Sequence, residues 1–250
     1  MSAESIFGKA AKGLITEYRA TLQVRDLLVG GVPSDVSVVR KWLEARMKLG
    51  DVALEELVAA TVAERDTAVS AQDKVDMVMA SEHAPSVNGF KRNENGVLCY
   101  ESRCLKAALK EAVNSQYPGV NYPGKTDERI VAYVSKRKGF MRTFAEMVFV
   151  RNSLLELGVK EPTRVEERIK HVMTAQGQRS AIGTVEVVER PLIVAQIGVH
   201  RDFVTEEAWA GIWTRAEDIG IGADRGRSDG QFDLVKWERK TGTRWTTIGE

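Results

Sequence analysis

Apolar and polar residues alternate along several short stretches of this chain, which is the pattern of half-buried β-strands. The alternation is clearest over 17–28, where a Gly-Gly-Val-Pro break follows. Two long β-rich runs, 182–188 and 192–199, are separated only by Glu189-Arg190-Pro191. The segments expected to form strands are 17–28, 130–134, 144–150, 168–173, 182–188, 192–199 and 232–238.

Other stretches repeat apolar residues at helical spacing. One spans 101–113, where apolar residues form one face and basic residues much of the other. A second spans 205–219, where Thr205 is suited to cap the helix and two glutamates follow it in the first turn. Its residues Trp209, Ile212 and Trp213 are expected to pack on a sheet that contains both 182–188 and 232–238.

Strands interleaved with amphipathic helices predict an α+β fold with helices on one face of an antiparallel sheet. The chain has 250 residues, a length that suits one large domain or two small ones. Of these we expect a single domain over 1–250.

Charge is nearly balanced overall but uneven along the chain. The 36 basic residues stand against 35 acidic ones. Residues 51–87 hold two bases and eight acids, a net charge of −6, whereas residues 88–142 hold 11 bases and five acids, a net charge of +6. Such opposed blocks fit a polyanion-binding face beside an acidic self-association face. The alternative, that both blocks are only solvated surface, stays open on charge alone.

Signals for catalysis, metals and membranes are weak. The two cysteines, Cys99 and Cys104, cannot build a four-thiolate zinc site, and the three histidines form no ligand pair. No phosphate-binding motif of the P-loop type is present, and no apolar stretch is long enough to cross a membrane. We expect a cytoplasmic, non-enzymatic protein without cofactor or metal.

The segment 220–232 carries the most chemistry. Its glycines Gly220, Gly222, Gly226 and Gly230 would let the backbone lie close to another backbone or to a phosphate chain. Arg225 and Arg227 stand at its tip, and arginine presents forked donors that suit phosphate. Alternatively, the two arginines could simply pair with Asp224 and Asp229 in a tight solvated connection.

A helix, a Gly-x-Gly-x-x-Arg-x-x-x-x-Gly-x-Phe loop and a closing strand together resemble the glycine-rich loop of the RAMP superfamily, the RNA-binding backbone subunits of CRISPR surveillance complexes. The order of the other elements is similar as well. The resemblance implies a ferredoxin-like, RRM-type βαββαβ core with helical and loop insertions. It is compatible with a solitary relative carried by a phage or plasmid. The core would comprise 14–30, 96–115 and 182–240, with a helical acidic insertion at 34–81 and a second insertion at 116–177.

These features predict a protein that binds single-stranded nucleic acid, RNA rather than DNA, and oligomerises along the strand as a helical or linear filament. The aromatic residues Phe90 and Tyr100 are candidates for stacking on bases. The candidate phosphate contacts are Arg25, Lys91, Arg92, Arg103, Lys106, Arg225 and Arg227. Two alternatives remain: an assembly protein, for example of a virion, without nucleic acid, and a metal-independent endoribonuclease of the same superfamily that uses His83 or His200.

Overall fold

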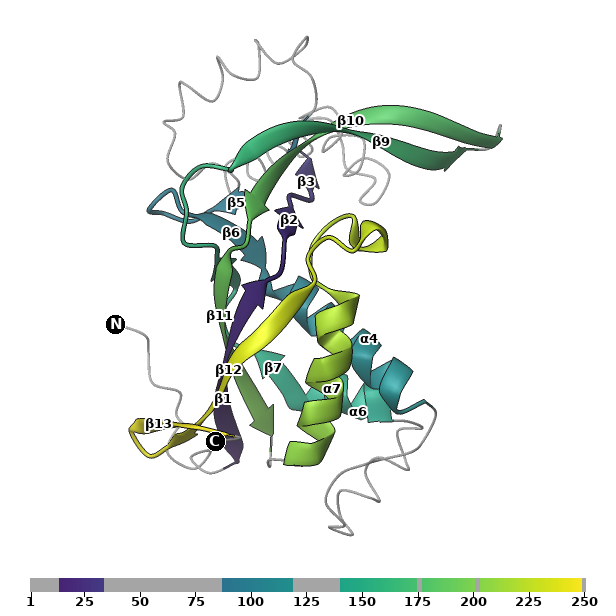
Figure 1. Cartoon of the computed structure of the whole chain (residues 1–250). Coiled ribbons are helices and arrows are strands. Elements are labelled where there is room, and N and C mark those ends of the chain that lie inside the picture. The colour runs from purple at the N-terminus through teal and green to yellow at the C-terminus, as the bar shows by residue number, and fades with distance from the viewer. Residues whose placement is uncertain (1–13, 34–86, 119–139, 175–176, 201–202, 249–250) are drawn as a thin grey trace, which may run out of the picture.

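The computed structural model describes residues 14–33, 87–118, 140–174, 177–200 and 203–248. Within these ranges the fold is α+β, with three α-helices and three sheets (Figure 1). The expected helices within 34–81 and the expected strand at 130–134 lie outside the described residues. No helix in the described ranges is long and apolar enough to span a membrane.

A five-stranded antiparallel sheet, here called the central sheet, organises the molecule. Its order is β13-β12-β1-β11-β7. The alternation predicted from the sequence places Tyr18, Ala20, Leu22 and Val24 of β1 in the core. The bounds of its strands are β1 Ile15–Val24, β7 Val148–Val150, β11 Leu192–His200, β12 Phe232–Thr241 and β13 Arg244–Thr247.

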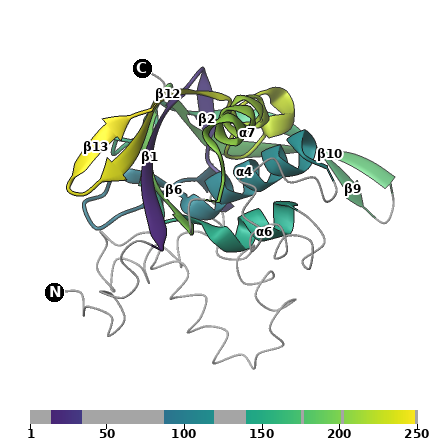
Figure 2. The ribbon, with the colours of Figure 1, turned by 90° about the horizontal axis from the view of Figure 1, so that it is seen from below.

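Three helices lie on one face of the central sheet, as the two ribbon views agree (Figures 1 and 2). They are α4 (Ser102–Gln116), α6 (Phe140–Met147) and α7 (Glu206–Ile219). The Thr205 hydroxyl accepts a hydrogen bond from the Ala208 amide at 3.2 Å, which confirms the predicted cap of α7. Trp209 and Trp213 are buried against Trp237 of β12, with ring centroids 5.2 and 5.4 Å away.

Two smaller sheets adjoin this body. One has the order β2-β10-β4-β3, with β9 also paired to β10, and the other has the order β5-β6-β8. The long β9–β10 hairpin projects beyond the rest of the described fold (Figure 1). The strands are β2 Leu27–Val29, β3 Val32–Pro33, β4 Val87–Gly89, β5 Lys91–Arg92, β6 Leu98–Glu101, β8 Leu154–Glu156, β9 Arg164–Thr174 and β10 Gly177–Glu189.

The structure corrects the expected sheet. Residues 182–188 belong to β10, which pairs with β9, β2 and β4 and not with the central sheet, so α7 packs on a sheet that contains β12 but not β10. The expected strand 144–150 is mostly α6, and only Val148–Val150 is extended. Phe140 and Phe144, one helical turn apart, are both buried, which favours the helix there. Within the second expected insertion, β7 pairs with β11 of the central sheet.

The Glu238 carboxylate lies on the face of the central sheet opposite the buried residues of β1, and its cationic partners there should make the stability of the protein depend on pH. Glu238 accepts hydrogen bonds from Arg19 Nε at 2.6 Å and Arg19 Nη2 at 2.8 Å, and Lys236 Nζ lies 3.0 Å away. The hydrogen bonds from Arg19 hold the pKa of Glu238 at about 2, well below its ordinary value.

Because the folded-state pKa is depressed, this stabilisation is complete above the ordinary carboxyl pKa and is lost as pH falls through the folded value. We expect thermal melts of the wild-type protein to lose stability between about pH 4.5 and pH 2 more steeply than melts of Glu238→Gln. Parallel curves for the two proteins across that window would contradict this role of Glu238.

Candidate nucleic-acid interface

The glycine-rich loop between α7 and β12 is tied down at its base. The Ile221 amide donates to the Gly230 carbonyl at 2.9 Å, and the Gly230 amide donates to the Leu27 carbonyl at 2.7 Å. Gly220, Gly222 and Gly230 have positive φ angles of 72°, 100° and 74°. A Cβ built on Gly230 would lie 1.7 Å from the Ile221 carbonyl oxygen, so this position accepts only glycine without a backbone shift.

The tip of the loop is a single 3₁₀ turn, η2 (Arg225–Arg227), between two residues in left-handed conformation, Asp224 and Ser228. Gly226 lies in this turn with open space where a side chain would stand and without a positive φ. The backbone therefore lies close to other atoms of the protein at the base of the loop, at Gly220, Gly222 and Gly230, but not at Gly226.

Arg225 and Arg227 are both exposed at this tip. Arg225 Nη1 donates to Glu111 of α4 at 2.9 Å, and Arg227 Nη2 donates to the Ile169 carbonyl of β9 at 2.7 Å. A guanidinium has five N–H donors, and each arginine uses one of them on a partner within the described residues, which leaves most of its donors for a further ligand. The sequence analysis left open that these arginines pair with Asp224 and Asp229, but the structure gives them other partners, Glu111 and the Ile169 carbonyl.

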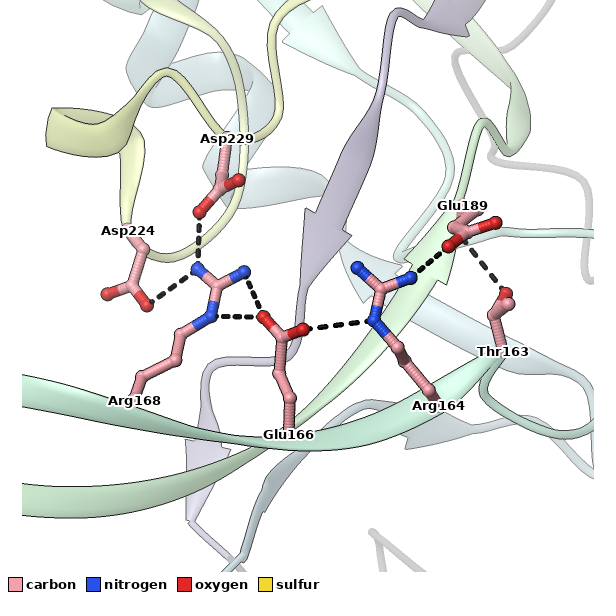
Figure 3. Close-up of polar contacts among 7 residues, drawn as sticks. All are labelled: Thr163, Arg164, Glu166, Arg168, Glu189, Asp224 and Asp229. Carbon is pink, nitrogen blue, oxygen red and sulfur yellow. Dashed lines mark hydrogen bonds and ion pairs between the residues drawn. The ribbon is translucent and has the colours of Figure 1, made fainter.

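Arg168 of β9 holds those two aspartates instead (Figure 3). Its Nη1 lies 3.2 Å from Asp224 Oδ2 and also donates to Asp229, while its Nε donates to Glu166 at 2.5 Å. Burial opposes the charge on Arg168, but the hydrogen bonds to Asp229 and Glu166 outweigh it and raise its pKa. Reasoning from the sequence missed this residue; the same-face spacing of Arg164, Glu166 and Arg168 was the available signal.

Four of the predicted site residues meet at a shallow hollow beside the loop. The hollow has a volume of about 100 Å³ and is lined by residues of β3 to β6 and the start of α4, including Phe90, Lys91, Tyr100 and Arg103. Lys91 Nζ lies 2.9 Å from Glu101, which also accepts a hydrogen bond from Arg103. Burial disfavours the Glu101 carboxylate, but the hydrogen bonds from Lys91 and Arg103 outweigh it, so the pKa of Glu101 is lowered. Two cations thus share one carboxylate here.

Phe90 and Tyr100 are core residues. Their exposures are only 3% and 9%, and their rings pack edge to face with centroids 6.0 Å apart. The Tyr100 hydroxyl lies close to the glycine-rich loop, because a Cβ built on Gly222 would stand 3.6 Å from its oxygen, and this contact places the hollow against the loop. Burial raises the pKa of the Tyr100 hydroxyl. A ring this deeply buried offers no free face to a base, so the structure contradicts the stacking role expected from the sequence.

The remaining predicted cations lie at other places. Arg25, in the turn after β1, donates to Asp233 at 2.7 Å. Arg92 of β5 donates to the Gly96 and Lys160 carbonyls. Lys106 of α4 lies over the Phe149 ring, 5.3 Å from its centroid, and burial followed by repulsion from Lys110 lowers its pKa.

The cysteines and histidines are the remaining residues considered for catalytic or metal chemistry. No cluster of three or more His, Cys, Asp or Glu residues suited to a metal ion occurs there. Cys99 and Cys104 both line the hollow, and burial raises the pKa of each thiol. His200 Nδ1 is buried without a hydrogen-bond partner in the described ranges, whereas His83 lies outside them.

Comparison with known proteins gives only distant structural similarity. No family model matches the chain, and no curated protein matches its sequence. One similar solved structure is the type III-B Cmr-beta complex bound to cognate target RNA, with 10% identity and a TM-score of 0.39. That match covers 92% of this chain and 63% of the other, so the chain spans less than two thirds of that subunit. A second is Cmr6 from Pyrococcus furiosus, with 12% identity over 88% of this chain and 99% of the other, also at a TM-score of 0.39.

Proposed function

We propose that this protein binds single-stranded nucleic acid, and RNA in preference to DNA, as a binding protein and not as an enzyme. The interface would comprise the tip of the glycine-rich loop, the first turns of α4 and the cations of the neighbouring hollow. Phosphate groups would contact Arg225, Arg227, Lys91 and Arg103. The preference for RNA rests on the resemblance of 220–232 to the glycine-rich loop of the RAMP superfamily.

One observation carries this proposal: the loop exposes its two arginines while both of its aspartates contact Arg168. Exposed arginines that retain free donors suit phosphate oxygens, because the fork of N–H groups matches their geometry. Had the aspartates paired with Arg225 and Arg227, both cations would be neutralised within the loop. Instead Arg225 has an exposed ion pair with Glu111 of α4, and Arg227 donates to a backbone carbonyl.

The central sheet supports the same proposal through its topology. We infer that β1, α4, β7, β11, α7 and β12 form a ferredoxin-like βαββαβ unit in which β7 takes the place of the second strand. In such a unit the fourth strand borders the first, the first borders the third, and the third borders the second. The observed order β12-β1-β11-β7, antiparallel throughout, has this arrangement.

We further propose that copies assemble side by side along the strand. This rests on the opposed charge blocks, −6 over residues 51–87 and +6 over residues 88–142. The acidic block lies almost entirely outside the described residues. The acidic block of one copy would be attracted to the basic block of the next copy, and salt would weaken this attraction.

Purification tests the proposed function simply. Protein purified at low salt should carry nucleic acid, seen as excess absorbance at 260 nm that ribonuclease or high salt removes. Regular oligomers free of nucleic acid would favour an assembly protein instead. Shortening of a labelled RNA in the presence of a chelator would favour the nuclease alternative.

A further inference from the structure

The β9–β10 hairpin and the glycine-rich loop hold each other by contacts that run in both directions. The Arg168 side chain of β9 reaches Asp224 and Asp229 of the loop, 56 and 61 residues later in the chain. In return, the Arg227 side chain of the loop donates to the backbone carbonyl of Ile169, the next residue of β9. We call this pair of contacts the clasp.

Arg168 is the most enclosed member of the clasp. Its side chain is only 7% exposed, and those of Asp224 and Asp229 are 22% and 11% exposed. Glu166 fixes the guanidinium from the strand side and is itself bonded by Arg164 Nε at 3.0 Å (Figure 3). Both loop carboxylates are therefore directed toward one oriented cation.

The contacts of Arg168 determine which charges of the loop are exposed to a ligand. Asp224 precedes Arg225 directly, and Asp229 lies two residues after Arg227. Without Arg168, two partly buried carboxylates would stand beside the two exposed arginines. They would compete for those guanidinium groups and repel an approaching phosphate, and like charges across an interface are costly.

We propose that Arg168 is a positioning residue for phosphate binding: it holds Asp224 and Asp229 away from the tip of the loop and fixes the hairpin against it, so that Arg225 and Arg227 face the ligand. This inference rests on the proposed function. Arg168 itself need not touch nucleic acid, because its donors face carboxylates of the protein.

The test compares four proteins by fluorescence anisotropy with a labelled single-stranded RNA of mixed sequence. They are the wild type, Arg168→Ala, Arg168→Ala combined with Asp224→Asn and Asp229→Asn, and Arg142→Ala. Arg142 is the control, because it is an exposed arginine of α6 whose ion pair is with Glu146 of the same helix and not with the hairpin or the loop. Thermal melts and hydrogen exchange of 220–230 accompany each titration.

We expect Arg168→Ala to weaken binding at least about tenfold and to increase exchange in the loop, since it leaves two carboxylates uncompensated. Neutralising both aspartates should restore most of the affinity even where the melting temperature stays low, which a purely structural role would not produce. Arg142→Ala should bind within about twofold of the wild type, because its ion pair with Glu146 is exposed and exposed ion pairs contribute little.

Three results separate the possible failures. If the wild type binds RNA and Arg168→Ala binds it equally well, this inference is wrong and the proposed function stands. A loss of binding that the two Asn substitutions do not restore would also overturn the inference, because Arg168 would then act by supporting the fold alone. If the wild type does not bind RNA, the proposed function itself is wrong and the inference falls with it.

Discussion

Replacing Arg225 and Arg227 together with alanine should abolish most of the RNA affinity while leaving the protein folded. Each charged hydrogen bond to phosphate contributes about 1–3 kcal/mol, so the double variant should bind at least about thirtyfold more weakly. Its stability should change only modestly. The ion pair of Arg225 with Glu111 is exposed, and exposed pairs are worth about 0–1 kcal/mol. Arg227 also loses one exposed hydrogen bond to the Ile169 carbonyl, worth about 0.5–1.5 kcal/mol.

The measurement is a pair of experiments on the same preparation: an RNA titration by anisotropy and a thermal melt by circular dichroism. A control replaces Arg142 of α6 and Arg244 of β13, two exposed arginines outside the loop and its contacts, with alanine. The control should retain affinity close to that of the wild type. If the loop variant binds like the control, the loop is not a phosphate site; if its melting temperature collapses, the arginines serve the fold.

Gly230→Ala should produce the largest loss of stability among single substitutions in the loop. The residue has a positive φ, and its new Cβ would meet the Ile221 carbonyl oxygen, so the base of the loop must shift. Left-handed backbone costs a side-chain-bearing residue about 1–2 kcal/mol, and forced overpacking adds about 1–3 kcal/mol. We expect a loss of more than about 2 kcal/mol, with weaker RNA binding because the tip is displaced.

Gly226→Ala is the internal control for that experiment. It lies in the same loop without a positive φ, and no atom of the described structure lies within 4 Å of the position that its new Cβ would take. Urea unfolding of this variant should agree with the wild type to within about 0.5 kcal/mol. Equal destabilisation by the two substitutions would contradict the role assigned to the base of the loop.

Local patterns predicted the elements whose signals lie within one short segment. The Thr205 cap and the helical spacing of Trp209 and Trp213 both appear in α7 as expected. The strand that closes the glycine-rich loop begins at Phe232, as predicted. In these cases the burial pattern and the capping chemistry agree, so local preference and tertiary packing favour the same conformation.

Strand pairing could not be predicted in the same way. The runs 182–188 and 192–199 look like a hairpin, but β10 pairs instead with β9 along eleven registered residue pairs. Val185 and Val187 of β10 then pack with Val29 in a small cluster separate from the main core. Alternation fixes which residues share a face of a strand, but not which other strand lies beside it.

The candidate site was predicted in part for the same reason. Its loop and its exposed arginines follow from composition within one segment. The role of Arg168 depends on a contact between residues far apart in the sequence, which no local pattern reveals. Phe90 and Tyr100 were expected to stack on bases, but both side chains point into the core from short strands or beside them, which a local pattern of residues does not reveal.

Titrating the wild-type protein with single-stranded RNA over a range of salt concentrations tests the central claim most directly. We predict saturable binding. The logarithm of the association constant should fall linearly with the logarithm of the salt concentration, with a slope of about −0.7 for each phosphate contacted. Removing Arg225 and Arg227 should reduce that slope by about 1.4 if each arginine contacts one phosphate. Absence of binding at low salt, or binding with a slope that the double substitution leaves unchanged, would contradict the assignment of this loop as a nucleic-acid interface.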